Sequence, residues 1–330
     1  MTHDATFFSV SNARYIPGLV AMVNSIRLTG HDNRIVVGDC GLTPAQRALL
    51  EKECTVVDLP REYATNPVVF KPFPRLVNPE GVVVLIDADM IVTGSLKPII
   101  ELAAQGRFCA FPDPESDRWF AEWQELFELQ SPPQRQTYLC AGFVAFSTDH
   151  FPVFLERWWH SSIRVPPHRT LAGGAPNSDP IAQADQDAMN ALLMSEVNSD
   201  AIHPLPMDAM PVFSSLARTR VADARTLACT LGQEPSLLLH AAGAGKPWDA
   251  GRGWKKVRRD AYVLLARRLL VGEDLPLRLP TTELPIWMQA GTSAELALRA
   301  LDAVNRALLP ARIHVTPRIR QGLRRLRPSS

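Results

Sequence analysis

The chain lacks several features that would mark special classes of protein. No stretch of its 330 residues reaches the roughly 20 apolar residues that a membrane-spanning helix needs. The first residues carry neither a basic segment nor a long apolar run, so no signal peptide is visible. Only five cysteines are present, widely scattered and without a Cys-x-x-Cys pair, which argues against a disulfide framework and a cysteine-based zinc site. We therefore expect reduced thiols and a cytoplasmic protein.

Net charge is almost absent as well. Lys and Arg number 35 against 34 Asp and Glu, a formal net charge of +1, which argues against a dedicated nucleic-acid binder. Hydrophobic residues make up 46% of the chain, enough for a core, and this composition excludes a disordered, collagen-like or coiled-coil protein.

Strand-like and helix-like segments alternate in the first half. Strands are expected at residues 5–10, 34–38, 55–59, 82–86, 108–111 and 143–146. Helices are expected at residues 15–29 and from Pro44, with Thr43 as N-cap. The alternation predicts an α/β fold with a largely parallel sheet and helices on both faces. Such sheets bind ligands at the carboxyl ends of their strands.

Two aspartates follow the apolar run at residues 82–86. Asp87 and Asp89 are separated by one residue, and positions i and i+2 of an extended segment point the same way. The two carboxylates can therefore converge on one hard cation. The alternative is a strand end with two solvated aspartates.

A second apolar run ends in His240 and is followed by two glycines and Lys246. Neutral imidazole is a ligand for Mn²⁺ and other divalent metals. Glycine lets backbone amides approach a phosphate, and Lys246 supplies a positive charge. The alternative is a core histidine beside a solvated lysine. A third segment, Asp185-Gln186, opens a helix-like stretch, where Asp185 is either an N-cap or a group that faces substrate.

Together these segments resemble the retaining glycosyltransferases of family 8, which include glycogenin and the bacterial lipooligosaccharide galactosyltransferases. The resemblance covers residues 5 to 250. The matching segments, in the family's order, are Asp87-Ala88-Asp89 for the metal-binding Asp-x-Asp, Cys140-Ala141-Gly142 for the usual Asn-Ala-Gly, Asp185-Gln186, and His240 with Gly243, Lys246, Pro247 and Trp248.

The resemblance implies a GT-A fold and transfer of a hexose from a nucleotide-diphosphate sugar, a UDP-sugar, to a saccharide or glycolipid hydroxyl with retained configuration. It implies that Asp87, Asp89 and His240 hold Mn²⁺, with Mg²⁺ as the other candidate, and that Asp185 and Gln186 are catalytic. The donor-binding residues that it implies are Asn12, Tyr15, Lys71, Ala88, Ala141, Gly142, Gly243, Gly245 and Lys246.

The chain departs from the family pattern at three places. Cys140 replaces the usual asparagine, Asn12 replaces an acidic residue, and Lys71 or Arg75 stands in for a Tyr-x-Arg segment. Two other functions remain open: a nucleotide-sugar-binding protein with weak catalysis, and an Asp-x-Asp phosphatase.

Residues 1–250 are expected to form the catalytic domain, and residues 251–330 a basic, largely helical extension. The loop at residues 164–180 is rich in Pro and Gly and is a candidate lid. Residues 311–330 carry six arginines and no acid, with apolar residues at helical spacing. This pattern is typical either of a solvated tail or of a basic helix that binds an anionic membrane surface. We expect peripheral attachment to the inner face of the cell membrane.

Overall fold

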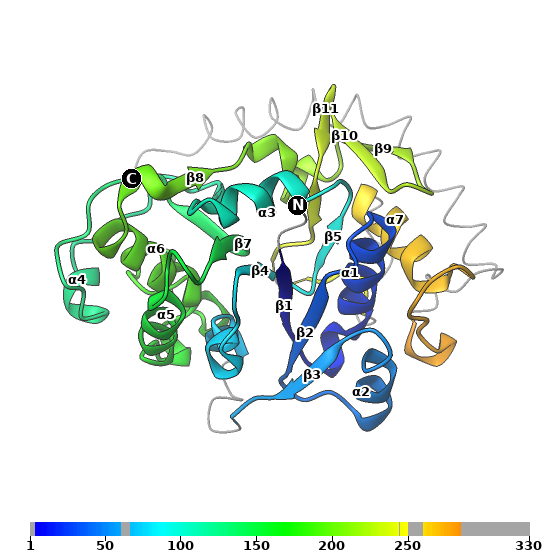
Figure 1. Ribbon diagram of the computed structural model, residues 1–330, viewed down its shortest axis with the longest axis horizontal. Coiled ribbons are helices and arrows are strands. Elements are labelled where there is room, and N and C mark those ends of the chain that lie inside the picture. The colour runs from blue at the N-terminus through cyan, green and yellow to red at the C-terminus, as the bar shows by residue number, and fades with distance from the viewer. Residues whose placement is uncertain (1–3, 61–66, 244, 250–259, 285–330) are drawn as a thin grey trace, which may run out of the picture. The chain divides into compact units, whose positions relative to one another are not determined.

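The computed structural model describes residues 4–60, 67–243, 245–249 and 260–284, and Figure 1 shows how their elements are arranged. The strands are β1 (Ala5–Ser11), β2 (Arg34–Asp39), β3 (Thr55–Asp58), β4 (Val82–Ile86), β5 (Met90–Val92), β6 (Phe108–Pro112), β7 (Leu139–Ser147), β8 (Ile202–Pro204), β9 (Thr219–Asp223), β10 (Ala228–Leu231), β11 (Glu234–Ser236) and β12 (Leu238–His240). The helices are α1 (Ile16–Leu28), α2 (Pro44–Leu50), α3 (Lys97–Ala104), α4 (Trp123–Leu126), α5 (Phe154–Ile163), α6 (Asp185–Glu196) and α7 (Ala261–Val271).

Seven strands form the central sheet, in the order β3-β2-β1-β4-β7-β6-β8. β1 runs parallel to β2 and β4, β2 to β3, and β6 to β8. β7 is the exception, because it lies antiparallel to both β4 and β6. In the register, Phe7 of β1 lies between Ile35 of β2 and Val84 of β4. The predicted α/β fold with a largely parallel sheet is confirmed.

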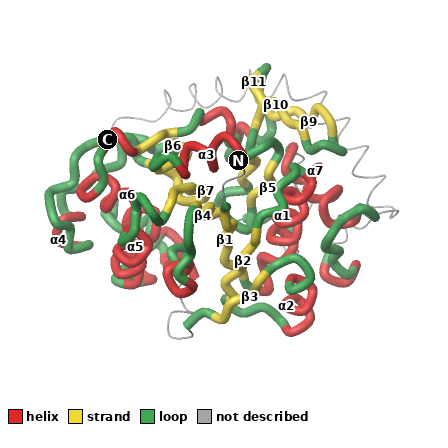
Figure 2. The backbone as a smooth tube through the Cα atoms, viewed as in Figure 1, coloured by secondary structure: helices red, strands yellow, loops and turns green. Residues whose placement is uncertain are grey.

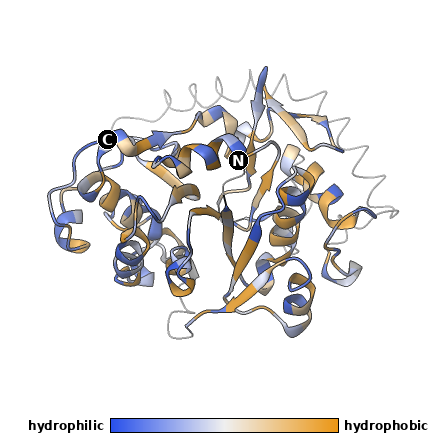
Figure 3. Ribbon diagram, viewed as in Figure 1, coloured by the Kyte–Doolittle hydropathy of each residue, from blue (hydrophilic) through white to orange (hydrophobic). Residues whose placement is uncertain are grey.

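Successive side chains of the strands point to opposite faces of this sheet, and side chains on both faces are buried. Figure 3 shows the hydrophobic residues along the strands. Phe8, Val83 and Val144 belong to a core that also contains Trp158 of α5 and Ala188 of α6. Their neighbours along the strands, Phe7, Val84 and Phe143, point to the opposite face and are buried as well. On that opposite side, α3 packs against β4, β6 and β7, and α1 packs against β1. β4 is buried along its whole length, as expected for a strand covered on both faces.

Two helices, α1 and α2, lie close to the positions predicted from hydrophobic spacing and from the N-cap residue. The helix expected at residues 15–29 is α1. Thr43 caps α2 through a reciprocal pair of hydrogen bonds: its hydroxyl accepts from the Gln46 backbone N–H at 3.3 Å, and the Gln46 side chain accepts from the Thr43 N–H at 3.1 Å.

The chain divides into two units, Met1–Leu279 and Pro280–Ser330. The first unit includes α7, which packs against α1, and the boundary expected at residue 250 stays a prediction. The buried Asn24 side chain of α1 donates to the carbonyl oxygens of Leu269 and Leu277, at 2.7 and 2.8 Å, and accepts from the Leu277 N–H at 3.0 Å.

Two small sheets accompany the central one (Figure 2). β9, β10 and β11 form an antiparallel sheet, and β12 pairs with β5. Among the described residues, no helix combines the length and the apolar character needed to cross a bilayer. The basic tail at residues 311–330 lies outside the described residues.

Candidate active site and metal centre

The aspartates of the Asp-x-Asp segment stand in the turn between β4 and β5. Met90 N–H donates to the Asp87 carbonyl at 3.0 Å, and Asp87 N–H donates to the Gly142 carbonyl of β7 at 2.8 Å. The side chain of Asp89 is 7% exposed and that of Asp87 is 26% exposed. The turn therefore fixes both carboxylates at the carboxyl end of a buried central strand, where α/β sheets bind ligands.

Strand pairing brings His240 to the same place. β12 pairs antiparallel with β5, so that His240 lies opposite Met90, and the Ala241 N–H donates to the Asp89 carbonyl at 3.0 Å. His240 Nε2 lies 3.4 Å from Asp89 Oδ1 and 3.8 Å from Asp87 Oδ2. One ligand atom from each of these three residues lies within 4.8 Å of the others. Two carboxylates and an imidazole in this arrangement suit a divalent cation.

Gly142 leaves room for this cluster. A Cβ atom built on Gly142 would lie 2.8 Å from His240 Cε1, 3.1 Å from Asp87 Oδ2 and 2.6 Å from Met90 Cε. Any other residue at position 142 would therefore displace two of the candidate ligands.

Two lysines, the partly buried Lys71 and the buried Lys246, pair with the carboxylates. Lys71 Nζ lies 2.8 Å from Asp87 Oδ1 and 3.4 Å from Asp185 Oδ2. Lys246 forms an ion pair with Asp89 and donates to the Ala241 carbonyl at 3.0 Å. Lys71 thus connects the metal-ligand candidates to the start of α6.

Asp185 and Gln186 occupy the first turn of α6. The N-cap is Ala184, so the alternative in which Asp185 caps the helix is wrong, and the Asp185 carboxylate faces Lys71 instead. Gln186 Oε1 accepts from the Ala141 N–H at 2.9 Å, which places Gln186 beside the Cys140-Ala141-Gly142 segment.

No protein-family model matches the chain, and no curated protein matches it. Among solved structures, the galactosyltransferase LgtC in complex with donor and acceptor sugar analogues matches with a TM-score of 0.50 and 17% identity, over 82% of this chain and 98% of that one. An active-site mutant of LgtC matches with a TM-score of 0.51 and 16% identity, over 79% and 95%. The bifunctional glycosyltransferase WbbM matches with a TM-score of 0.51 and 16% identity, over 82% and 50%. The chain has the GT-A glycosyltransferase fold.

Of the other predicted donor-binding residues, Tyr15 contacts the site through Lys246 and Ala88 lies within the carboxylate turn, whereas Asn12 lies after β1. Asn12 caps the turn after β1, and its side chain accepts from the Arg14 N–H at 3.1 Å. The Tyr15 ring lies 5.4 Å from Lys246 Nζ and packs edge-on against Trp248. The Ala88 carbonyl approaches α1 so closely that a Cβ on Gly18 would lie 2.5 Å from it.

Gly243 and Gly245 follow β12. Gly243 has a φ of +95°, a backbone conformation that favours glycine. Gly245 is exposed. Both positions follow the metal-ligand candidate His240 and precede Lys246.

Charge within the site is tightly balanced. Burial opposes ionisation of Asp89, but His240 and Lys246 outweigh burial and hold the pKa of that carboxyl well below its usual range. Burial also disfavours a charged His240, yet Asp89 raises the pKa of the imidazole to about 10. Burial raises the pKa of Asp185 to about 6, against the opposing effect of Lys71.

Sequence reasoning missed one polar residue of the site and left another undecided. Asp113, directly after β6, accepts a hydrogen bond from Gln186 Nε2 at 3.0 Å, and no motif signalled it. Arg75, the other residue that could stand in for the Tyr-x-Arg segment, pairs with Glu156 at 3.1 Å.

The segment proposed as a lid contains two short 3₁₀ helices, and its end is tied down by two arginines. Arg169 pairs with Asp179 at 2.7 Å, and Arg118 donates to the backbone carbonyls of Asn177 and Asp179.

Proposed function

We propose that this protein is a metal-dependent retaining glycosyltransferase that moves a hexose from a nucleotide-diphosphate sugar, a UDP-sugar, to a hydroxyl of a saccharide or glycolipid. One observation carries the proposal. On a GT-A fold, the cluster of Asp87, Asp89 and His240 lies next to Asp185, and Lys71 contacts both Asp87 and Asp185. A cation site for a diphosphate thus adjoins a carboxylate able to bind sugar hydroxyls. The LgtC structure with donor and acceptor sugar analogues supports the substrate classes.

The residues of the cluster fit a divalent metal. Their ligand atoms converge within 4.8 Å, and Gly142 leaves the space that a larger residue would fill. Oxygen and imidazole ligands together suit Mn²⁺, with Mg²⁺ as the second candidate. A metal bound there would neutralise the donor diphosphate and act as a Lewis acid toward the leaving group.

Lys246 and the backbone amides of Gly243 and Gly245 would bind the distal phosphate. Negative charge on that phosphate grows as the glycosidic bond breaks, so donors already in place stabilise the transition state more than the ground state. Asn12 and Tyr15 would bind the nucleoside, and Ala88, Ala141 and Gly142 would contact the donor through their backbones.

Asp185 would accept hydrogen bonds from sugar hydroxyls, and Gln186 would lie near the anomeric carbon. An amide is a poor nucleophile, so we favour attack on the face from which the diphosphate departs. In that step the acceptor oxygen bonds to the anomeric carbon as the carbon–phosphate oxygen bond breaks. The acceptor's proton passes to the departing phosphate, and the configuration is retained.

A donor screen tests the proposal. The full-length protein is incubated with Mn²⁺ and a panel of nucleotide sugars, and release of nucleoside diphosphate is followed with and without saccharide acceptors. A retained anomeric configuration in the product, determined by NMR, supports the mechanism. Binding without turnover would favour the nucleotide-sugar-binding alternative, and release of inorganic phosphate from phosphomonoesters would favour the phosphatase.

A further inference from the structure

The Gln186 carboxamide is held at both ends by partners of opposite kind. Its Oε1 accepts from the Ala141 backbone N–H at 2.9 Å, and its Nε2 donates to Asp113 Oδ2 at 3.0 Å. A backbone N–H only donates, and an ionised carboxylate only accepts. Rotating the amide by half a turn would therefore place two donors face to face at Ala141 and two acceptors at Asp113. The pair of contacts defines one orientation of Gln186.

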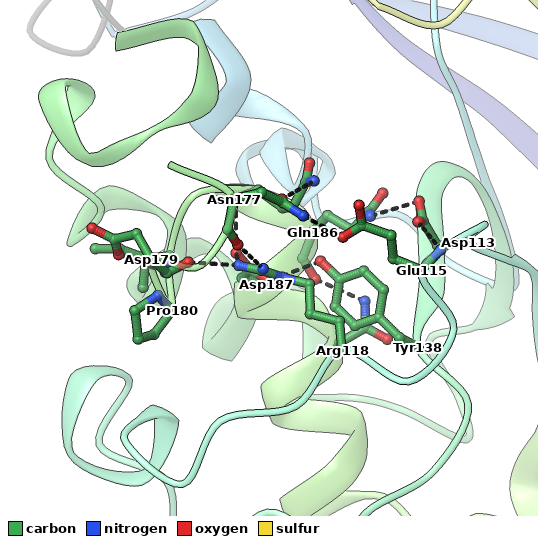
Figure 4. A network of polar contacts seen from close by, with 12 residues as sticks. Asp113, Glu115, Arg118, Tyr138, Asn177, Asp179, Pro180, Gln186 and Asp187 are labelled. Atoms are coloured by element: carbon green, nitrogen blue, oxygen red, sulfur yellow. Dashed lines mark hydrogen bonds and ion pairs between the residues drawn. The ribbon is translucent and has the colours of Figure 1, made fainter. Parts of the chain in front are cut away.

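The backbone that carries Gln186 has little freedom of its own. Ala184, immediately before α6, has a φ of +51° and a ψ of −116°, a conformation that favours glycine. The fully buried carboxylate of Asp187 holds this turn. It accepts from Arg118 at 2.6 and 2.8 Å, from the Tyr138 hydroxyl at 2.8 Å and from the Gln183 N–H at 2.8 Å (Figure 4).

Asp113 is itself anchored. Its Oδ1 accepts from the Glu115 N–H at 2.9 Å, which leaves Oδ2 for Gln186. Its backbone N–H donates to the Tyr138 carbonyl at 3.0 Å. Tyr138 thus connects the strand end that carries Asp113 to Asp187 on α6 (Figure 4). The Asp113 carboxylate that contacts Gln186 is therefore held in position by its own hydrogen bonds.

From this arrangement we propose that Asp113 is a positioning residue that selects the orientation of the Gln186 carboxamide at the reaction centre. This inference rests on the proposed function, because it assigns Gln186 a place near the anomeric carbon. Asp113 acts through Gln186 and is not assigned a contact with substrate. Asp113 should therefore affect kcat and not the KM for donor, since other residues are proposed to bind the donor diphosphate.

Substitution of Asp113 tests the kinetic part. Asp113→Ala removes the acceptor for Gln186 Nε2 and is expected to lower kcat on the order of 10-fold to 100-fold. The KM for donor should stay close to that of the wild type, so that the loss is confined to kcat, a split that a merely structural role would not give. Asp113→Ala also removes the acceptor for the Glu115 N–H, so a small fall in melting temperature is expected as well. Asp117→Ala is the matched control, because Asp117 is an exposed carboxylate of the same loop.

A double-substitution cycle tests the orientation without any turnover. Gln186→Glu sets a second carboxylate against Asp113 and should lower the melting temperature. Adding Asp113→Asn offers amide hydrogens to the new carboxylate, so the double variant should recover most of the loss. Asp113→Asn alone should not stabilise the protein, because its amide group then meets that of Gln186.

A wild-type kcat for Asp113→Ala, or two substitutions whose melting effects simply add, would overturn the inference. Because the melting cycle needs no substrate, it separates failure of this inference from failure of the proposed function, which the donor screen decides.

Discussion

The ammonium of Lys71 lies 3.4 Å from the carboxylate of Asp185 while it also holds Asp87 at 2.8 Å. One partly buried cation therefore pairs with both the turn after β4 and the first turn of α6. Burial lowers the pKa of Lys71, but Asp185 and Asp87 outweigh burial and keep the pKa above its usual value. Without Lys71, the buried Asp185 and the partly exposed Asp87 would lose the counter-charge that they share.

Asp89→Asn should remove metal-dependent transfer. The variant loses a charged ligand and the counter-charge of the diphosphate, a loss of about 3 kcal/mol of transition-state stabilisation, or roughly 100-fold in rate. Mn²⁺ binding by calorimetry and nucleoside diphosphate release measure the effect, and circular dichroism verifies the fold. Asp208→Asn, at an exposed position, is the control. His240→Ala should be milder, because both carboxylates remain. Near-wild-type turnover of Asp89→Asn in Mn²⁺ would contradict the metal assignment.

Lys246→Ala should lower kcat more than it weakens donor binding. In the proposed mechanism, a contact between Lys246 and the distal phosphate would strengthen as the leaving group gains charge, so its removal should cost roughly 100-fold in kcat. Steady-state kinetics with varied donor separate the two parameters, and Lys97→Ala at an exposed position is the control. A change confined to the KM for donor would make Lys246 a ground-state ligand only.

Gln186→Ala should react slowly but still bind donor. In the proposed mechanism the amide lies near the anomeric carbon, whereas the metal ligands and Lys246 bind the diphosphate. Donor affinity from isothermal titration in Mn²⁺ should match that of the wild type, while kcat falls by about 10-fold to 100-fold. Lost donor affinity would contradict this placement of Gln186.

Stability should fall below neutral pH because of His31. Its Nε2 accepts from the Leu96 N–H at 3.0 Å, and burial lowers the pKa of the imidazole below its usual 6.5. Below pH 6.5 the unfolded chain takes up a proton that the folded chain does not, so unfolding becomes easier as the pH falls toward the lowered pKa.

Melting temperatures between pH 8 and pH 5 measure this effect. His31→Gln keeps an acceptor for Leu96 but does not titrate, so its melting temperature should fall less with pH than that of the wild type. His168→Gln, at an exposed position, should follow the wild type. Equal pH slopes for His31→Gln and the wild type would remove His31 as the cause.

Residues 311–330 should bind an anionic membrane surface, where each arginine contributes about 1 kcal/mol. Full-length protein should co-sediment with anionic vesicles at low salt and dissociate at high salt. Deletion of residues 311–330 should abolish co-sedimentation but spare donor hydrolysis in solution. Failure of the full-length protein to co-sediment would end the membrane proposal and leave the glycosyltransferase proposal intact.

Much of the local structure could be predicted from periodicity and end signals. The buried run at residues 82–86 is β4, and Asp87 and Asp89 follow it directly. Thr43 was likewise predicted as the N-cap of α2, because the backbone N–H that it accepts from lies within one turn of helix. These features depend on residues close together in the chain, so the sequence carries them in full.

The position of His240 beside the aspartates, however, was predicted only through the resemblance to the family and not from a local sequence pattern. The approach itself depends on the pairing of β12 with β5, between segments about 150 residues apart, and no local pattern encodes that register. The antiparallel course of β7 has the same origin.

The sequence by itself determined which residues end the strands and which side chains can ligate a metal or bind a phosphate. Only the tertiary structure decided that Lys71 contacts both Asp87 and Asp185, and that Asp113 holds Gln186. The physical reason is the range of the interactions involved. Hydrophobic periodicity and capping act over a few residues, whereas a buried charge finds its partner only after distant strands have paired and packed.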